Sequence, residues 1–225
     1  MRIADEMARR RGLRLIGFHK AGIGARTARE IAAALDDVLT LSDAVDLRVI
    51  EITEAPDGPF ARIRWDESSG TADRAGRLVL DRARLVAASP RTEVPRGDAG
   101  PVRVPGAEDS VYGSIVREFG RALDEAGGRA AHRKLQQVLI DEYLHRADPN
   151  YRSRPLGRVV AGYRRWRSQL PGAGPVAGFD AGSVLAAAFL AVVSGTGGVV
   201  AERLHGLLLD AAHRRVLYVS AVEVE

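Results

Sequence analysis

The sequence of 225 residues contains no cysteine, and it has very few lysines and aromatic residues. Without cysteine, the chain can form neither disulfide bonds nor thiolate metal sites, and its redox compartment cannot be inferred. Lys20 and Lys134 are the only lysines, so nearly all of the 33 basic side chains are arginine. Together with abundant alanine, glycine and valine, this bias indicates a GC-rich genome rather than a binding role. The formal net charge of +4 permits an acidic partner without requiring one.

Long hydrophobic runs are missing as well. The longest apolar run, residues 184–193, is too short to span a bilayer. The N-terminus lacks the apolar stretch and cleavage site of a standard signal peptide. We therefore expect a soluble protein, either cytoplasmic or exported as part of a longer chain. The length predicts a single domain over residues 1–225, and the sequence is also compatible with a fragment of a larger protein.

Hydrophobic periodicity predicts helices in much of the chain. The segment 27–39 has apolar residues on one face, and Thr27 and Glu30 match a capping box at its start. After residue 109 the pattern is helical almost throughout, with helices expected at 110–126, 129–146, 156–169, 180–193 and 199–215. The segment 180–193 is apolar on nearly all sides, which predicts a buried helix. The tail, residues 216–225, alternates like a strand.

Three β-rich segments lie between the first of these helices and residue 89, at 46–53, 59–66 and 76–86. The turn sequence EAPDG joins the first two, so we expect them to pair as an antiparallel hairpin. Residues 89–108 are rich in proline and glycine and predict a long loop. The order of a helix, a sheet and then helices predicts an α+β fold. We expect an N-terminal helix, a small antiparallel or mixed sheet and a mostly helical C-terminal half.

The segment IVREFGRALDEAGG, residues 115–128, is the most informative motif in the chain. It resembles the active helix of zincin metallopeptidases, most closely that of zincin-like domains common in actinobacteria. Their helix reads approximately V-x-H-E-F-G-H-A-L-D-x-x-G-G. In this sequence Arg117 and Arg121 replace the two ligand histidines, whereas Glu118 keeps the position of the general base.

Two later segments extend this resemblance, which covers roughly residues 13–215. WRSQLPGAG (166–174) and FDAGSVLAAAF (179–189) occupy the places of two further motifs of these domains. Ser183 then stands at the third-ligand glutamate, and Ala187 at a second acidic position. The resemblance implies a zincin-like core with a leading helix and a small sheet whose edge strand borders the cleft. The active helix follows, and a later helix carries the third ligand.

The chemistry of such a site predicts its loss in this chain. Two histidines at i and i+4 on one helix face reach a single Zn²⁺, and the glutamate accepts a proton from the metal-bound water. Arginine stays protonated and offers no lone pair, so Arg117 and Arg121 cannot ligate zinc. We therefore expect no metal, no cofactor and no peptidase activity. Glu118 would be a vestigial general base in a pseudopeptidase.

The resemblance also predicts what such a domain does. We expect it to bind a protein partner or a small anion through the old cleft, with Arg117 and Arg121 as the anion-binding residues. The alternative for this helix is an ordinary charged face, in which Glu118 and Arg121 form an i, i+3 pair.

A second candidate surface lies in residues 151–167, which contain six arginines and no acidic residue. These arginines are Arg152, Arg154, Arg158, Arg164, Arg165 and Arg167. Tyr151, Tyr163 and Trp166 interleave with them, a pattern compatible with binding nucleic acid, an acidic protein or anionic lipid head groups. An apolar stripe along the same helix indicates that at least one aromatic ring packs in the core, which favours a solvated basic face. A hydrolase of unrecognised mechanism stays a further alternative, although no G-x-S-x-G motif supports it.

Overall fold

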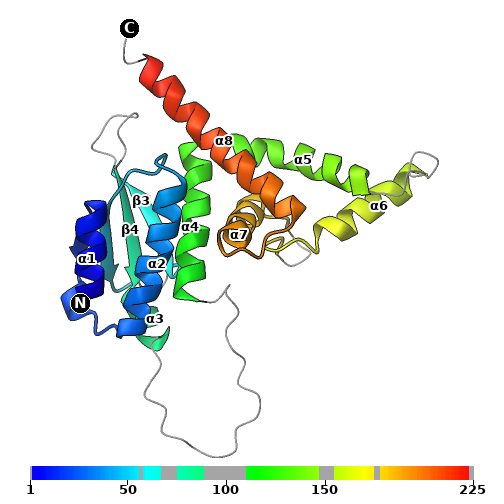
Figure 1. Ribbon diagram of the computed structural model, residues 1–225. Coiled ribbons are helices and arrows are strands. Elements are labelled where there is room, and N and C mark those ends of the chain that lie inside the picture. Colours follow the sequence, from blue (N-terminus) through cyan, green and yellow to red (C-terminus); the bar gives the residue numbers. More distant parts are fainter. Residues whose placement is uncertain are drawn as a thin grey trace, which may run out of the picture. The chain divides into compact units, whose positions relative to one another are not determined.

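The computed structural model describes residues 2–55, 58–66, 75–88, 110–146, 155–174 and 178–222. The chain divides into two compact units, Met1–Phe119 and Gly120–Glu225, and their boundary falls inside helix α4 (Val111–Ala126). Figure 1 shows the elements of both units. The single domain expected over residues 1–225 stays a prediction. The long loop expected at 89–108 lies outside the described residues.

The first unit combines a small sheet with helices. Its elements in chain order are α1 (Arg2–Arg11), β1 (Arg14–Ile16), a 3₁₀ turn (Phe18–Lys20), α2 (Ala25–Leu41), β2 (Leu47–Thr53), β3 (Ala61–Trp65), β4 (Gly76–Asp81), α3 (Arg82–Ala88) and the first half of α4. The sequence predicted α2, the three longer strands and α4, but the third strand was expected over 76–86, whereas β4 ends at Asp81 and α3 follows it. The sequence has no signal for β1, because a three-residue strand is too short to show a period.

The sheet has the strand order β1-β2-β4-β3. β1 and β4 both run parallel to β2, and β3 runs antiparallel to β4, so the sheet is mixed. The hairpin expected between residues 46–53 and 59–66 is therefore wrong, because β4 lies between these two strands. β4 is buried at almost every position, which suits an interior strand, whereas β3 exposes Arg62 and Arg64 in alternation, which suits an edge.

One face of this sheet belongs to the apolar core. Ile50 pairs with Leu78 and Ile52 with Leu80, and all four side chains are buried. The opposite face is polar and carries the ion pair between Arg77 and Glu51, at 2.9 Å. This alternation explains why these short segments form strands.

Helix α2 begins earlier than the capping-box pattern predicted. Gly24 is its N-cap residue and makes no side-chain cap hydrogen bond. Thr27 is buried inside the helix, and Glu30 pairs with Arg26 at 3.1 Å. The predicted Thr27–Glu30 capping box is therefore wrong. The apolar face prevailed over the cap signal, since burial of that face stabilises a helix more than one cap does.

The second unit is helical in all of its described elements. After the second half of α4 come α5 (Ala130–Arg146), α6 (Leu156–Arg167), α7 (Ala181–Val193) and α8 (Val199–Val222). α7 is buried continuously from Val184 to Leu190, which confirms the predicted buried helix. It packs along α8, and α5 contacts both of them (Figure 1). No helix among the described residues is long and apolar enough to span a membrane.

The C-terminal tail differs from the sequence prediction. Residues 216–222 continue α8 instead of forming a strand, and residues 223–225 lie outside the described part of the chain. The reason is cooperativity, because extending an existing helix adds one hydrogen bond for each residue that is fixed. Taken together, the helices and the mixed sheet confirm the predicted α+β class.

Candidate functional site

Helix α4 presents the motif residues from a well-packed framework. Ser110 accepts a hydrogen bond from the Gly113 N–H at 2.9 Å and so caps the start of the helix. Ile115, Phe119 and Leu123 follow the helical period of this segment and are completely buried. The remaining faces of α4 carry Arg117, Glu118 and Arg121, and these side chains take up three different environments.

Glu118 contacts the sheet. Its Oε1 accepts a hydrogen bond from the backbone N–H of Ile63 at 2.8 Å, and the residue is only 9% exposed. Ile63 lies in β3, the edge strand, so the carboxylate satisfies a backbone donor that no neighbouring strand pairs in the described sheet. One oxygen of Glu118 is therefore committed to a structural hydrogen bond.

Arg121 contacts the first turn of α7. Its Nη2 donates to Ser183 Oγ at 3.3 Å, and Ser183 Oγ donates in turn to Asp180 Oδ2 at 2.5 Å. Asp180 is the N-cap residue of α7, and its Oδ1 accepts a hydrogen bond from the Gly182 N–H at 3.0 Å. These contacts form a short polar chain from α4 to the start of α7.

The electrostatics of this chain favour an ionised Asp180. The pKa of Asp180 is lowered, chiefly by the hydrogen bond from Ser183 and also by backbone N–H groups and the charge of Arg121, although partial burial opposes the shift. A carboxylate with a lowered pKa is a weak base, so it does little to activate the hydroxyl that donates to it.

The glycine of the REFGR motif has a packing role. A Cβ at Gly120 would lie 3.1 Å from both Ala186 Cα and Phe189 Cβ of α7. The absence of a side chain therefore lets α4 and α7 approach closely just before Arg121. This close approach brings the guanidinium of Arg121 to Ser183, which lies 62 residues away in the sequence.

Arg117 lies one helical turn before Arg121 and is half-buried. It belongs to the first unit, and its side chain or backbone interacts with other groups of the protein. Among the residues that the structure describes, no three His, Asp or Glu side chains are placed to hold a metal ion together.

The arginine-rich segment is only partly described. Arg152 and Arg154 lie outside the described residues, and Arg158, Arg164 and Arg165 are exposed on α6. Arg167 differs from them, because it donates to Gln136 Oε1 at 3.2 Å and its guanidinium lies 4.4 Å from the ring centroid of Phe179.

The aromatic residues of this segment pack against one another. The rings of Tyr163 and Trp166 lie 5.6 and 5.7 Å from that of Tyr143 and 6.1 Å from each other, measured between centroids. Such a cluster uses the ring faces for tertiary packing. Stacking on bases therefore has little support from these two residues.

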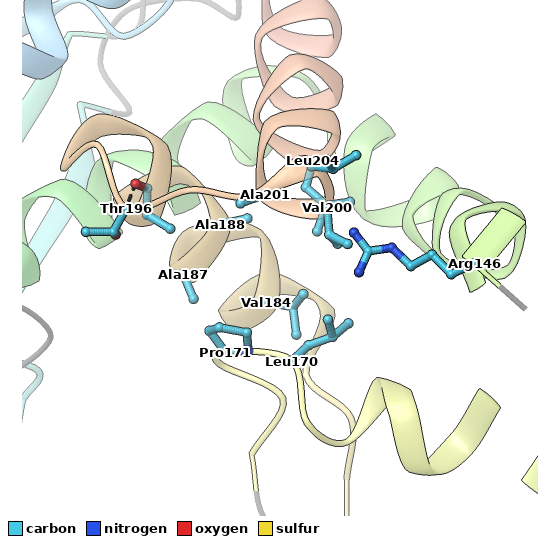
Figure 2. Close-up of a pocket in the computed structure, with 13 residues that line it drawn as sticks. Arg146, Leu170, Pro171, Val184, Ala187, Ala188, Thr196, Val200, Ala201 and Leu204 are labelled. Atoms are coloured by element: carbon cyan, nitrogen blue, oxygen red, sulfur yellow. Dashed lines mark hydrogen bonds between the residues drawn. The ribbon is translucent and has the colours of Figure 1, made fainter. Parts of the chain in front are cut away.

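A cavity that the sequence analysis did not anticipate lies within the second unit. It has a volume of about 230 Å³ and is lined by apolar residues of α7 and α8 and of the connection before α7, with Arg146 at its side (Figure 2). The sequence signal is the set of small residues Ala187, Ala188 and Ala191, whose short side chains leave space next to α7. No family model, curated protein or solved structure matches this chain.

Proposed function

We propose that this chain is a catalytically inactive zincin-like domain, a pseudopeptidase, that binds an anionic group where a zincin holds zinc. The ligand is a small anion or a carboxylate of a protein partner. The observation that carries the proposal is the hydrogen bond between Arg121 and Ser183. The resemblance assigns these two positions to ligands of one zinc ion, and they meet across α4 and α7. An ordinary charged helix face has no reason to place them together.

The side chains at the site support a non-catalytic role. Arginine at 117 and 121 cannot supply a lone pair to a metal ion. Glu118 uses one oxygen to hold the edge strand instead of facing a metal-bound water. Ser183 donates its hydrogen bond to Asp180, whose lowered pKa makes it a poor general base. These features give no support to a hydrolase.

Anion binding follows from the chemistry of the guanidinium group. Its planar fork of donors matches carboxylate, sulfate and phosphate. Asp180 is an internal competitor, because its charge reaches Arg121 through Ser183. An external anion must displace part of this interaction. Removing the charge of Asp180 should therefore strengthen anion binding at Arg121. Non-specific binding of anions elsewhere on the surface would not become tighter in this variant.

Calorimetric titration with phosphate and with acetate tests this proposal. We expect Asp180→Asn to tighten binding and the double variant Arg117→Gln/Arg121→Gln to weaken it by about tenfold or more, because charge-assisted hydrogen bonds contribute about 1.5–3 kcal/mol. The matched control is Arg158→Gln/Arg164→Gln, which removes the same charge from α6. Equal losses in the two double variants would refute an anion site on α4.

The ancestry of the site has its own test. Arg117→His, Arg121→His and Ser183→Glu together supply a His₂Glu set with one position open for water. We expect this triple variant to bind one zinc ion per chain and to gain thermal stability with zinc, since binding to the native state alone shifts unfolding. The double histidine variant, which lacks the third ligand, should bind zinc weakly. A folded triple variant that takes up no zinc would contradict the zincin alignment.

A second candidate function has one observation in its favour. Leu156 on α6 is 77% exposed, and the same helix also exposes Arg158, Arg164 and Arg165. An apolar anchor among cations fits an acidic protein surface better than nucleic acid, because the nearby aromatic rings are packed together. Loss of binding to an acidic peptide in Leu156→Ser, with single-stranded DNA as the comparison ligand, would favour this function.

A further inference from the structure

The cavity of the second unit has almost entirely apolar walls. Leu170 and Pro171 form one side, Val184 and Ala188 of α7 form another, and Leu204 belongs to the wall from α8 (Figure 2). Pro171 is exposed, whereas Val184 and Leu204 are buried, so the cavity leads inward from the surface. A cavity of about 230 Å³ exceeds the roughly 150 Å³ of an apolar cavity that binds benzene, so it has room for one ring and a short chain.

One charged side chain, Arg146 at the end of α5, is present among the lining residues that the structure describes. Figure 2 shows its guanidinium extended toward Val200 of α8. Its Nε donates to Glu142 Oε1 at 2.7 Å, and among the described residues its two Nη nitrogens make no hydrogen bond. Glu142 is almost completely buried and also pairs with Arg203 at 2.8 Å.

A single carboxylate pairs with two arginines beside the cavity. Within the part of the chain that the structure describes, Glu142 pairs with the guanidinium groups of both Arg146 and Arg203, so these three side chains together carry one net positive charge. Because Glu142 holds the Nε of Arg146, the orientation of the guanidinium fork is fixed before any ligand arrives. A pre-oriented fork of two Nη donors matches the two oxygens of a carboxylate. A neutral ligand would leave the charge unmatched, and an amine would be repelled by it.

We propose that this cavity binds a small carboxylic acid with a compact apolar body, whose carboxylate pairs with Arg146. The apolar body, a ring or a short branched chain, occupies the space beside Ala187, Ala188 and Ala191. Arg146 is half-exposed, so its contribution is that of a partly solvated ion pair and gives moderate affinity. This site shares no residue with the anion site on α4, and each can fail without the other.

Phenylpropionate is a suitable probe, with phenylpropionamide and phenylpropylamine as its neutral and cationic analogues. We expect saturable binding of the carboxylate by calorimetry, with about tenfold weaker binding of the amide and still weaker binding of the amine. In Arg146→Gln the carboxylate should lose this advantage and bind like the amide, because the apolar contacts remain. Arg62→Gln, which removes the same charge from an exposed position on β3, is the matched control and should leave both affinities unchanged.

Filling the cavity tests its apolar part. Ala188→Leu places a larger side chain in the cavity and should abolish binding of both the acid and the amide. Ala191→Val is a smaller change at a half-buried position, and it keeps the test usable if Ala188→Leu does not fold. The proposal is overturned if the carboxylate does not bind saturably, or if acid and amide bind equally to the wild type. Undiminished binding in a folded cavity-filling variant also overturns it.

Discussion

Replacing Glu118 separates a structural role of this residue from a catalytic one. Glu118→Ala removes the acceptor of the Ile63 N–H and leaves that donor without its partner on the edge strand. Hydrogen bonds to a charged group contribute about 1.5–3 kcal/mol, so we expect a loss of that size in the free energy of unfolding. Glu118→Gln keeps a side-chain oxygen at the same reach and should cost clearly less than the alanine variant.

Two measurements check this expectation. Urea denaturation gives the change in stability, and amide hydrogen exchange reports on Ile63 itself. A loss of 1.5–3 kcal/mol corresponds to roughly tenfold to hundredfold faster exchange at Ile63 in Glu118→Ala. Leu78, which pairs with Ile63 from the neighbouring strand, provides an internal comparison in the same experiment. If Glu118→Ala changes neither the stability nor the exchange of Ile63, the structural role assigned to this carboxylate is refuted.

Three further predictions concern the core, one histidine and the polar chain at α7. Phe119 is fully buried, so Phe119→Ala should lower the free energy of unfolding by about 3–5 kcal/mol in urea denaturation. Burial lowers the pKa of His205 below 6.5, so the folded state disfavours its protonated form and loses stability as the pH falls below that value. His205→Phe keeps the stack on Phe189 and removes the titrating group. The melting temperature of the variant minus that of the wild type should therefore increase as the pH is lowered from about 7 to about 5. Ser183→Ala removes the main cause of the lowered pKa of Asp180 and should move that pKa back toward 3.8 in an NMR titration.

The pairing of the strands illustrates what a sequence pattern can and cannot determine. Segments 46–53 and 59–66 have strand character, and the turn residues between them are compatible with a hairpin. What decides their pairing is β4, which is buried at almost every position and therefore takes the place between them. The difference between Leu78-Val79-Leu80 and the alternating Arg62 and Arg64 was visible in the sequence. To prefer this difference over the turn sequence between the first two segments, one has to compare the hydrophobicity of all three strands.

The candidate site shows the same division between local and long-range information. The helical period of residues 115–128 places Arg117 and Arg121 one turn apart, and the resemblance identifies Ser183 as a third position. The sequence does not reveal that Asp180 accepts from Ser183, because this depends on how the first turn of α7 is capped. It does not reveal the cavity beside Arg146 either. A cavity forms where small residues of one helix lie opposite a neighbouring helix that has no large side chain to fill the space, and this depends on how the helices pack.

The contact between α4 and α7 bears most directly on the choice between a degenerate site and a charged helix face. A solvated arginine needs only a place on the exposed side of a helix, and any small or large residue can precede it. In this chain Gly120 is packed against the backbone of Ala186, and even a methyl group there would come within 3.1 Å of α7. The helix thus gives up the stability that alanine would add at this position, roughly 0.5–1 kcal/mol, to bring the two elements together. This close approach places Arg121 within hydrogen-bond distance of Ser183, the pair of positions that the proposed zincin alignment equates with zinc ligands.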